Sequence, residues 1–214
     1  MVKCLVSVLL LCCMLMATGC AATVTALRHK DLDVQTQMSK SVFLDPTVNK
    51  ADSNIYVRLT NTTAVNMDDM APLLVARLQS KGMNVVADAS QAHYILQINV
   101  LSIGMMDKSA LEKNMNLGFG GVVVGATIGA LAAPSGHGWG GAGVGGLIWS
   151  IGEVISGTLV KEVNYSMITD LQITEGRKVH NTRIGSTATQ VNLEFEEAYP
   201  SLRDQLVESI VGMF

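Results

Sequence analysis

Side chains that could carry chemistry are scattered along this chain rather than gathered into motifs. The acidic pairs Asp68-Asp69 and Glu196-Glu197 are most simply explained as charges at helix N-termini, where the helix dipole favours them. Neither G-x-S-x-G nor H-E-x-x-H occurs. The four histidines show no metal-ligand spacing: they are His29, His93, His137 and His180. The sequence therefore predicts a protein that is not an enzyme and that holds no metal or cofactor.

One side chain, that of Cys20, does suggest covalent chemistry. Lys3 precedes a 13-residue apolar run, Cys4–Met16, which has the pattern of a signal peptide and is too short for an ordinary transmembrane helix. Cleavage after residue 19 would remove the other three cysteines of the chain. A mature chain with a single cysteine cannot form an internal disulfide, so its thiol needs another explanation.

The residues before Cys20 supply that explanation. Ala17-Thr18-Gly19 followed by cysteine resembles the lipobox of bacterial lipoproteins, although leucine is usual where Ala17 stands. The resemblance implies a signal peptide of residues 1–19 and an N-acyl diacylglyceryl lipid on Cys20. Two or three acyl chains anchor a protein firmly, whereas one binds a membrane only marginally. Ala21 replaces the aspartate that retains enterobacterial lipoproteins in the inner membrane, which implies the outer membrane. The alternative is an ordinary secretory signal with a chance cysteine.

The longest apolar stretch, residues 117–160, predicts a helical hairpin. Leu117–Ala133 has 17 residues without a charge, and Trp139–Val160 has 22 residues with one charge. The Pro134–Gly138 segment between them is a turn signal. At about 1.5 Å per helical residue, each arm is long enough to cross, or nearly cross, a hydrocarbon layer about 30 Å thick.

Glycines with a spacing of four residues line each arm of this hairpin. Small residues in such stripes let helices pack closely within a membrane. A buried core hairpin and a flexible glycine-rich loop are the alternatives. The predicted packing residues are Gly121, Gly125 and Gly129 on the first arm, and Gly141, Gly145 and Gly146 on the second.

Three further hairpin residues are candidates for the membrane boundary or an oligomer interior. Glu153 is the one charge between Leu117 and Val160, and exposing a carboxylate to lipid is costly. Trp139 and Trp149 are candidate interfacial anchors, with ordinary core tryptophans as the alternative.

The rest of the chain predicts an α+β body, residues 20–116 and 161–214. We expect a small antiparallel sheet packed by two helices, with the glycine-rich hydrophobic helical hairpin inserted between adjacent antiparallel strands. The formal net charge is −3, with no basic stripe and no aromatic platform, which excludes nucleic acid as a partner. The expected strands are a first strand within 23–40, then 42–44, 55–60, 84–87, 93–103, 161–174 and 191–196, and the expected helices are 68–81 and 197–213.

Several stretches resemble the TraT family of surface-exclusion and complement-resistance lipoproteins encoded by conjugative plasmids. The resemblance covers nearly the whole mature chain and includes the glycine-rich hairpin. Its most specific runs are Tyr165–Ile173 and Asn192–Ala198. The other matching runs are Thr18–Cys20, Leu32–Ser39 and Leu44–Pro46.

The resemblance implies a lipid-anchored outer-membrane protein at the cell surface, assembled as a homo-oligomeric ring. In a recipient cell, such a protein reduces mating-pair formation with donors that carry related plasmids, and some members reduce killing by complement. The implied partners are further copies of the chain, outer-membrane lipid, and the donor mating apparatus or complement components. Plasmid-borne members carry a longer polar segment where this chain has only Thr174–Gln190. The alternatives are therefore a general envelope lipoprotein and a hydrophobic pore or plug without exclusion activity.

Overall fold

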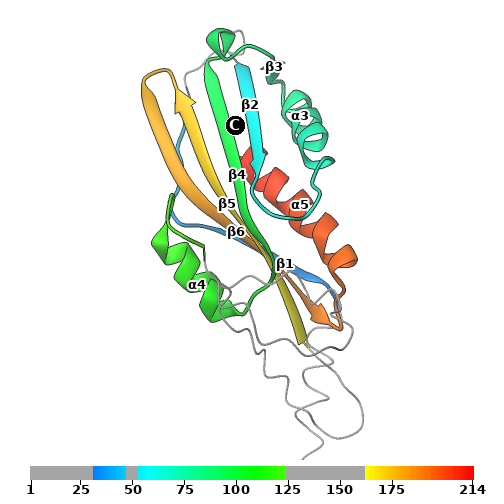
Figure 1. Ribbon diagram of the computed structural model, residues 1–214. Helices are drawn as coiled ribbons and strands as arrows, with labels where there is room; N and C mark the ends of the chain where they lie inside the picture. The colour runs from blue at the N-terminus through cyan, green and yellow to red at the C-terminus, as the bar shows by residue number, and fades with distance from the viewer. Residues whose placement is uncertain (1–30, 47–52, 124–161) are drawn as a thin grey trace, which may run out of the picture.

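The computed structural model describes residues 31–46, 53–123 and 162–214. They form one six-stranded sheet with three α-helices packed against it (Figure 1). In spatial order the strands are β1 (Asp33–Met38), β6 (Lys178–Val191), β5 (Glu162–Glu175), β4 (Tyr94–Met105), β2 (Asn54–Asn61) and β3 (Asn84–Val86). The helices are α3 (Met70–Ser80), α4 (Lys108–Leu117) and α5 (Phe195–Val211), with a short 3-10 helix, η2, at Ala89–Gln91.

The prediction of a small antiparallel sheet packed by two helices is wrong. β2 runs parallel to both of its neighbours, β3 and β4, whereas the β1–β6, β6–β5 and β5–β4 pairs are antiparallel. The physical reason lies in α3. This helix connects β2 to β3 as a crossover, which carries the chain back to the end of the sheet where β2 began, so the next strand runs in the same direction.

One face of the sheet is covered by α3 and α5 and holds the main core (Figure 1). Strand residues alternate between the two faces, and β4 and β5 turn apolar side chains toward these helices. The inward helix residues are the ones that the helical spacing predicts: Met70, Leu74 and Leu78 on α3, and Leu202, Leu206 and Ile210 on α5. Local periodicity thus identifies this layer correctly.

The opposite face carries α4, a helix that the sequence analysis did not expect in the polar connection 104–116. Leu111 and Met115, four residues apart, pack with Met106 on Ile168 of β5 in a separate apolar cluster. The helix lies very close to β6 at Gly185, where a Cβ atom would meet the Met115 sulfur at 2.7 Å. Glycine at this position therefore lets α4 sit directly on the sheet.

Asp107 fixes the start of α4. Its carboxylate accepts hydrogen bonds from the Ser109 hydroxyl and the Ala110 backbone N–H, each at 2.7 Å, and these hold the pKa of Asp107 below its usual value. We expect Asp107→Ala to lower the free energy of unfolding by about 1 kcal/mol, measured by denaturant titration. Asp88→Ala, which removes the cap of only the three-residue η2, is the control. An effect of Asp107→Ala no larger than that of the control would contradict this capping role.

Two further expectations about strands are wrong. Residues 42–44 are irregular rather than an edge strand, and the expected strand 191–196 is the end of β6 followed by the start of α5. Asn192 separates the two elements with a φ of 54°, a left-handed conformation that asparagine tolerates and that breaks a strand. The polar segment before Asn192 forms β6. The hydroxyl groups and the arginine of this strand form hydrogen bonds in the folded protein.

The two strands expected to flank the insertion, 93–103 and 161–174, correspond to β4 and β5 and pair in antiparallel fashion, as expected. β4 and β5 pair up to Met105↔Tyr165, so the chain leaves and re-enters the sheet at neighbouring positions. Residues 124–161, and with them most of the predicted hairpin, lie outside the described residues, and the domain boundaries remain predictions. None of the helices that the structure does describe combines the length and apolar character needed to span a bilayer.

Candidate functional site: a buried clamp on the inserted segment

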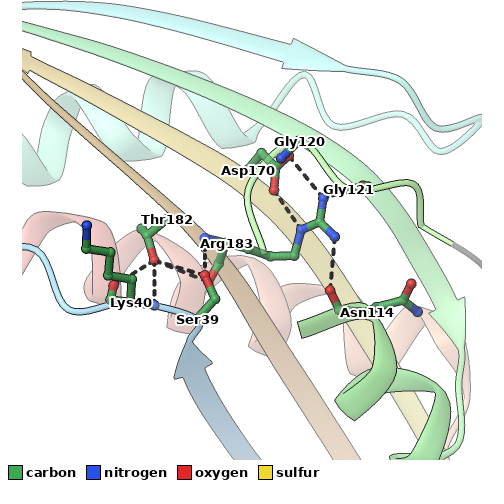
Figure 2. A network of polar contacts seen from close by, with 8 residues as sticks. All are labelled: Ser39, Lys40, Asn114, Gly120, Gly121, Asp170, Thr182 and Arg183. Atoms are coloured by element: carbon green, nitrogen blue, oxygen red, sulfur yellow. Dashed lines mark hydrogen bonds and ion pairs between the residues drawn. The ribbon is translucent and has the colours of Figure 1, made fainter. Parts of the chain in front are cut away.

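A buried ion pair joins the two long strands beneath α4. Asp170 of β5 and Arg183 of β6 are cross-strand partners, so both side chains project from the same face of the sheet. The guanidinium donates from Nε to Asp170 Oδ1 at 2.7 Å and from Nη2 to Oδ2 at 3.1 Å (Figure 2). Arg183 is fully buried and Asp170 is 7% exposed. This two-point contact is the strongest geometry that an arginine and a carboxylate can form.

The same pair binds the chain that leads into the insertion. Arg183 donates from Nη1 to the Asn114 carbonyl at 3.0 Å and from Nη2 to the Gly121 carbonyl at 2.6 Å. In the other direction, the Gly120 N–H donates to Asp170 Oδ2 at 2.8 Å. Gly120 has a φ of +79°, a conformation that side chains rarely adopt, which allows the turn that aims these groups inward. We call these two side chains and the three backbone groups they bind the clamp.

The segment after β1 is tied to the same place. The Arg183 N–H donates to the Ser39 hydroxyl at 2.9 Å, and the Ser39 N–H donates to the Arg183 carbonyl at 2.8 Å. The Thr182 hydroxyl donates to the Lys40 carbonyl at 2.7 Å. Three segments far apart in the sequence therefore meet at the clamp, as Figure 2 shows.

The chemistry of the clamp is structural. The two charges compensate each other, and two further guanidinium N–H groups donate to main-chain carbonyls. Taking a carboxylate and a guanidinium out of water is costly, so a buried pair is by itself weak support for stability. What the pair does is fix 114–121 relative to the sheet, because backbone groups that lost these partners would be buried without hydrogen bonds.

Other polar groups in the described part of the chain do not form a comparable site. A cavity of about 190 Å³ between β1 and α4 is lined mainly by hydroxyl and amide side chains, among them that of Ser166. At the far end of the sheet, His180 Nε2 and Glu175 Oε2 lie 3.6 Å apart. Within 31–46, 53–123 and 162–214, no group of three or more histidine, cysteine or acidic side chains could hold a metal ion.

The acidic pairs near helix starts have different surroundings in the folded protein. Glu196 and Glu197 lie in the first turn of α5, as expected. Asp69, before α3, accepts a hydrogen bond from the Tyr199 hydroxyl at 2.5 Å and pairs with Arg203. Partial burial alone would raise the pKa of Asp69, but the hydrogen bonds from Tyr199 and Arg203 outweigh it and lower that pKa. This contact joins α3 to α5.

Of the predicted site residues, only Gly121 lies within the described chain. It is not helical there, because α4 ends at Leu117, and its carbonyl is the one that Arg183 binds. An added Cβ at Gly121 would meet Leu117 Cβ at 2.7 Å. The other predicted residues lie outside the described chain and their roles stay predictions: Cys20, Gly125, Gly129, Gly141, Gly145, Gly146, Trp139, Trp149 and Glu153.

Sequence reasoning missed both side chains of the clamp. Asp170 lies in the expected strand 161–174 but was not a candidate site residue, and Arg183 lies in a segment for which no strand was expected. One signal was available: Asp170 is the single acidic residue within the run 163–174. Its partner could not be found in the same way, because their pairing depends on the register of β5 and β6.

The fold and the clamp together define the class of protein. It is an α+β scaffold in which a buried ion pair binds residues 114–121 of the connection between the neighbouring strands β4 and β5. The sequence profile described as the enterobacterial TraT complement resistance protein matches residues 31–180 and 175–214. The chain therefore belongs to the TraT family.

Individual relatives agree along almost the whole chain. A TraT complement resistance protein from Escherichia coli is 31% identical over 243 residues, covering 99% of this chain and 98% of the relative. One from E. coli strain K12 is 32% identical, with the same coverage. One from Wigglesworthia glossinidia brevipalpis is 26% identical, covering 92% of this chain and 90% of the relative.

Solved structures resemble the chain only loosely. A PelC dodecamer from Paraburkholderia phytofirmans has a TM-score of 0.37 and 11% identity, covering 86% of this chain and 98% of PelC. A DUF4136 family protein from Bacteroides thetaiotaomicron has a TM-score of 0.34 and 14% identity, covering 85% and 97%.

The comparison also shows that this chain is shorter than a relative. The alignment with the first E. coli relative runs over 243 positions, whereas this chain has 214 residues, so that relative carries residues absent here. The two matched ranges meet at 175–180, which contains the turn between β5 and β6. The expectation that the missing residues belong to the segment 174–190 stays a prediction.

Proposed function

We propose that this protein is a surface lipoprotein of the outer membrane that assembles as a homo-oligomer and limits conjugative entry of related plasmids, with complement resistance as a second activity. The match to TraT complement resistance proteins over 98% of a relative's length carries the proposal. Acyl chains on Cys20 anchor each subunit, and the inserted segments of neighbouring copies pack through their glycine stripes in or against the bilayer.

The clamp supports the mechanical part of this proposal. Asp170 and Arg183 bind the backbone on the entry side of the insertion at three points: Asn114, Gly120 and Gly121. β5 begins at Glu162, on the exit side, and is paired on both edges by β4 and β6. Residues 114–121, held this way, form one unit with the body. A closed ring of such units, with head-to-tail interfaces, would then present the bodies together to an incoming cell or to complement.

The proposal is tested in recipient cells that express the protein at native levels. We expect a lower mating frequency with donors that carry related plasmids, and higher survival in serum, than in cells with an empty vector. The matched control is Cys20→Ser at equal expression, which should show neither effect because it lacks the anchor. An unchanged mating frequency with every related donor would contradict the proposed exclusion activity. Unchanged serum survival would contradict the proposed complement resistance.

A further inference from the structure

Large apolar side chains are exposed at the C-terminal end of α4 and in the residues that follow it. Leu117 is 56% exposed, Phe119 41% and Val122 72%. Met38 is 43% exposed and lines the same groove as Phe119. Only Phe43 and Val179 join these four as exposed large apolar residues in the described chain. Such clustering indicates a contact surface rather than chance exposure. We call Met38, Leu117, Phe119 and Val122 the root surface.

The clamp imposes this exposure. Gly120 and Gly121 turn their backbone groups inward to Asp170 and Arg183. Phe119 and Val122, which flank the two glycines, are left on the outer side of the chain. A segment that merely lacked contacts could fold these side chains inward, whereas here the backbone is held by hydrogen bonds to two buried charges. The apolar surface is therefore a built feature of the fold.

The groove beside the root surface is lined by three apolar side chains, four uncharged polar side chains and one lysine. It has a volume of about 430 Å³ and lies between residues 37–40 and the end of α4. Met38, Met115 and Phe119 line it, and Lys40 is the one charged side chain among its lining residues. Lys113 lies one helical turn before Leu117, on the same side of α4. Apolar groups with lysines at their border suit an amphiphilic, negatively charged partner.

We propose that the root surface rests on a lipid bilayer whose anionic phospholipid headgroups contact Lys40 and Lys113, while Phe119 and Val122 enter the boundary of the acyl chains. The inference rests on the proposed membrane anchoring and adds to it the part of the body that touches lipid. The direction of the chain supports this partner, since the sequence runs on from Val123 to Ala133 without a charge. A lipid surface also matches the mixture of aromatic, aliphatic and lysine side chains.

The test places a fluorescent probe on single cysteines of the full-length, acylated protein in proteoliposomes. Acylation blocks the thiol of Cys20, so Val122→Cys supplies the one free thiol of the mature chain. Val179→Cys is the matched control, because Val179 is also an exposed valine, at 54%, but lies beside the far turn of β6. We expect nitroxide-labelled lipid to quench the probe at position 122 and not at position 179.

A second arm tests the headgroup contact. Lys40→Gln combined with Lys113→Gln should reduce quenching at position 122 on vesicles that contain phosphatidylglycerol, and should have little effect on pure phosphatidylcholine. Each lysine near an anionic surface is expected to change the strength of this docking about fivefold. Equal loss in both lipids would overturn the headgroup contact.

Two results at position 122 would overturn the inference as a whole. The first is lipid quenching no stronger than at position 179. The second is a probe protected from aqueous iodide yet untouched by lipid quencher, which would mean that a second copy of the chain covers the root surface. Sizing in detergent tests the proposed assembly independently of the lipid contact. A monomer would contradict the ring, and the quenching at positions 122 and 179 could still be measured.

Discussion

Arg183→Met is expected to lower the free energy of unfolding by about 3–5 kcal/mol, because the change leaves the Asp170 carboxylate buried without its partner. The carbonyls of Asn114 and Gly121 lose their donor in the same step. Denaturant titration of the detergent-solubilised protein measures the loss. Arg77→Met is the control, since Arg77 forms an ion pair with Glu208 in which both side chains are about half exposed, and such pairs contribute about 0–1 kcal/mol.

The double variant Arg183→Met with Asp170→Leu separates charge from anchoring. Removing both charges should recover much of the lost stability, because no uncompensated charge remains buried. The backbone at 114–121 would still lack its partners, so its amide hydrogens should exchange faster than in the unchanged protein. If Arg183→Met costs no more than Arg77→Met, or if exchange at 114–121 stays slow in the double variant, the clamp does not anchor the insertion.

The second large effect concerns Cys20. We expect Cys20→Ser to abolish acylation and to move the protein out of the membrane fraction, because the anchor would require two or three acyl chains on this residue. Mass spectrometry of the purified protein measures the lipid, and fractionation of cells measures retention. Cys13→Ser, within the predicted signal peptide, should leave both unchanged. An unaltered lipid mass in Cys20→Ser would end the lipoprotein interpretation.

The predicted shortening of the segment 174–190 would lie at the β5–β6 turn and bears on the exclusion specificity proposed for this protein. In this chain, Glu175 and Lys178 face each other directly across a tight turn. Extra residues at that turn in relatives would extend the tip of the strand pair, at the end of the sheet opposite to α4 (Figure 1). If those residues select the donor cell, exchanging the turn between this protein and a longer relative should exchange exclusion specificity without affecting assembly.

The sequence by itself determined the features that depend on near neighbours along the chain. Helices α3 and α5 were predicted because their apolar residues recur at helical spacing, so the buried face can be read without knowing the partner. The end of α3 at Ser80, one residue before the predicted end at 81, and the strands 94–105 and 162–175 followed from equally local signals. The family resemblance was also visible in short runs such as Tyr165–Ile173.

Only the tertiary structure decided the features that depend on which strands pair and in what register. Periodicity shows that 55–60 is a strand but not that it runs parallel to β4, because direction is set by the α3 crossover. α4 was hidden because its apolar residues are few and are buried only against β5 and β6. Asp170 and Arg183 became a clamp because antiparallel pairing of two 14-residue strands places them opposite each other, 13 positions apart in the sequence. A buried polar pair of this kind has no local pattern, since each side chain is acceptable there only when the other is present.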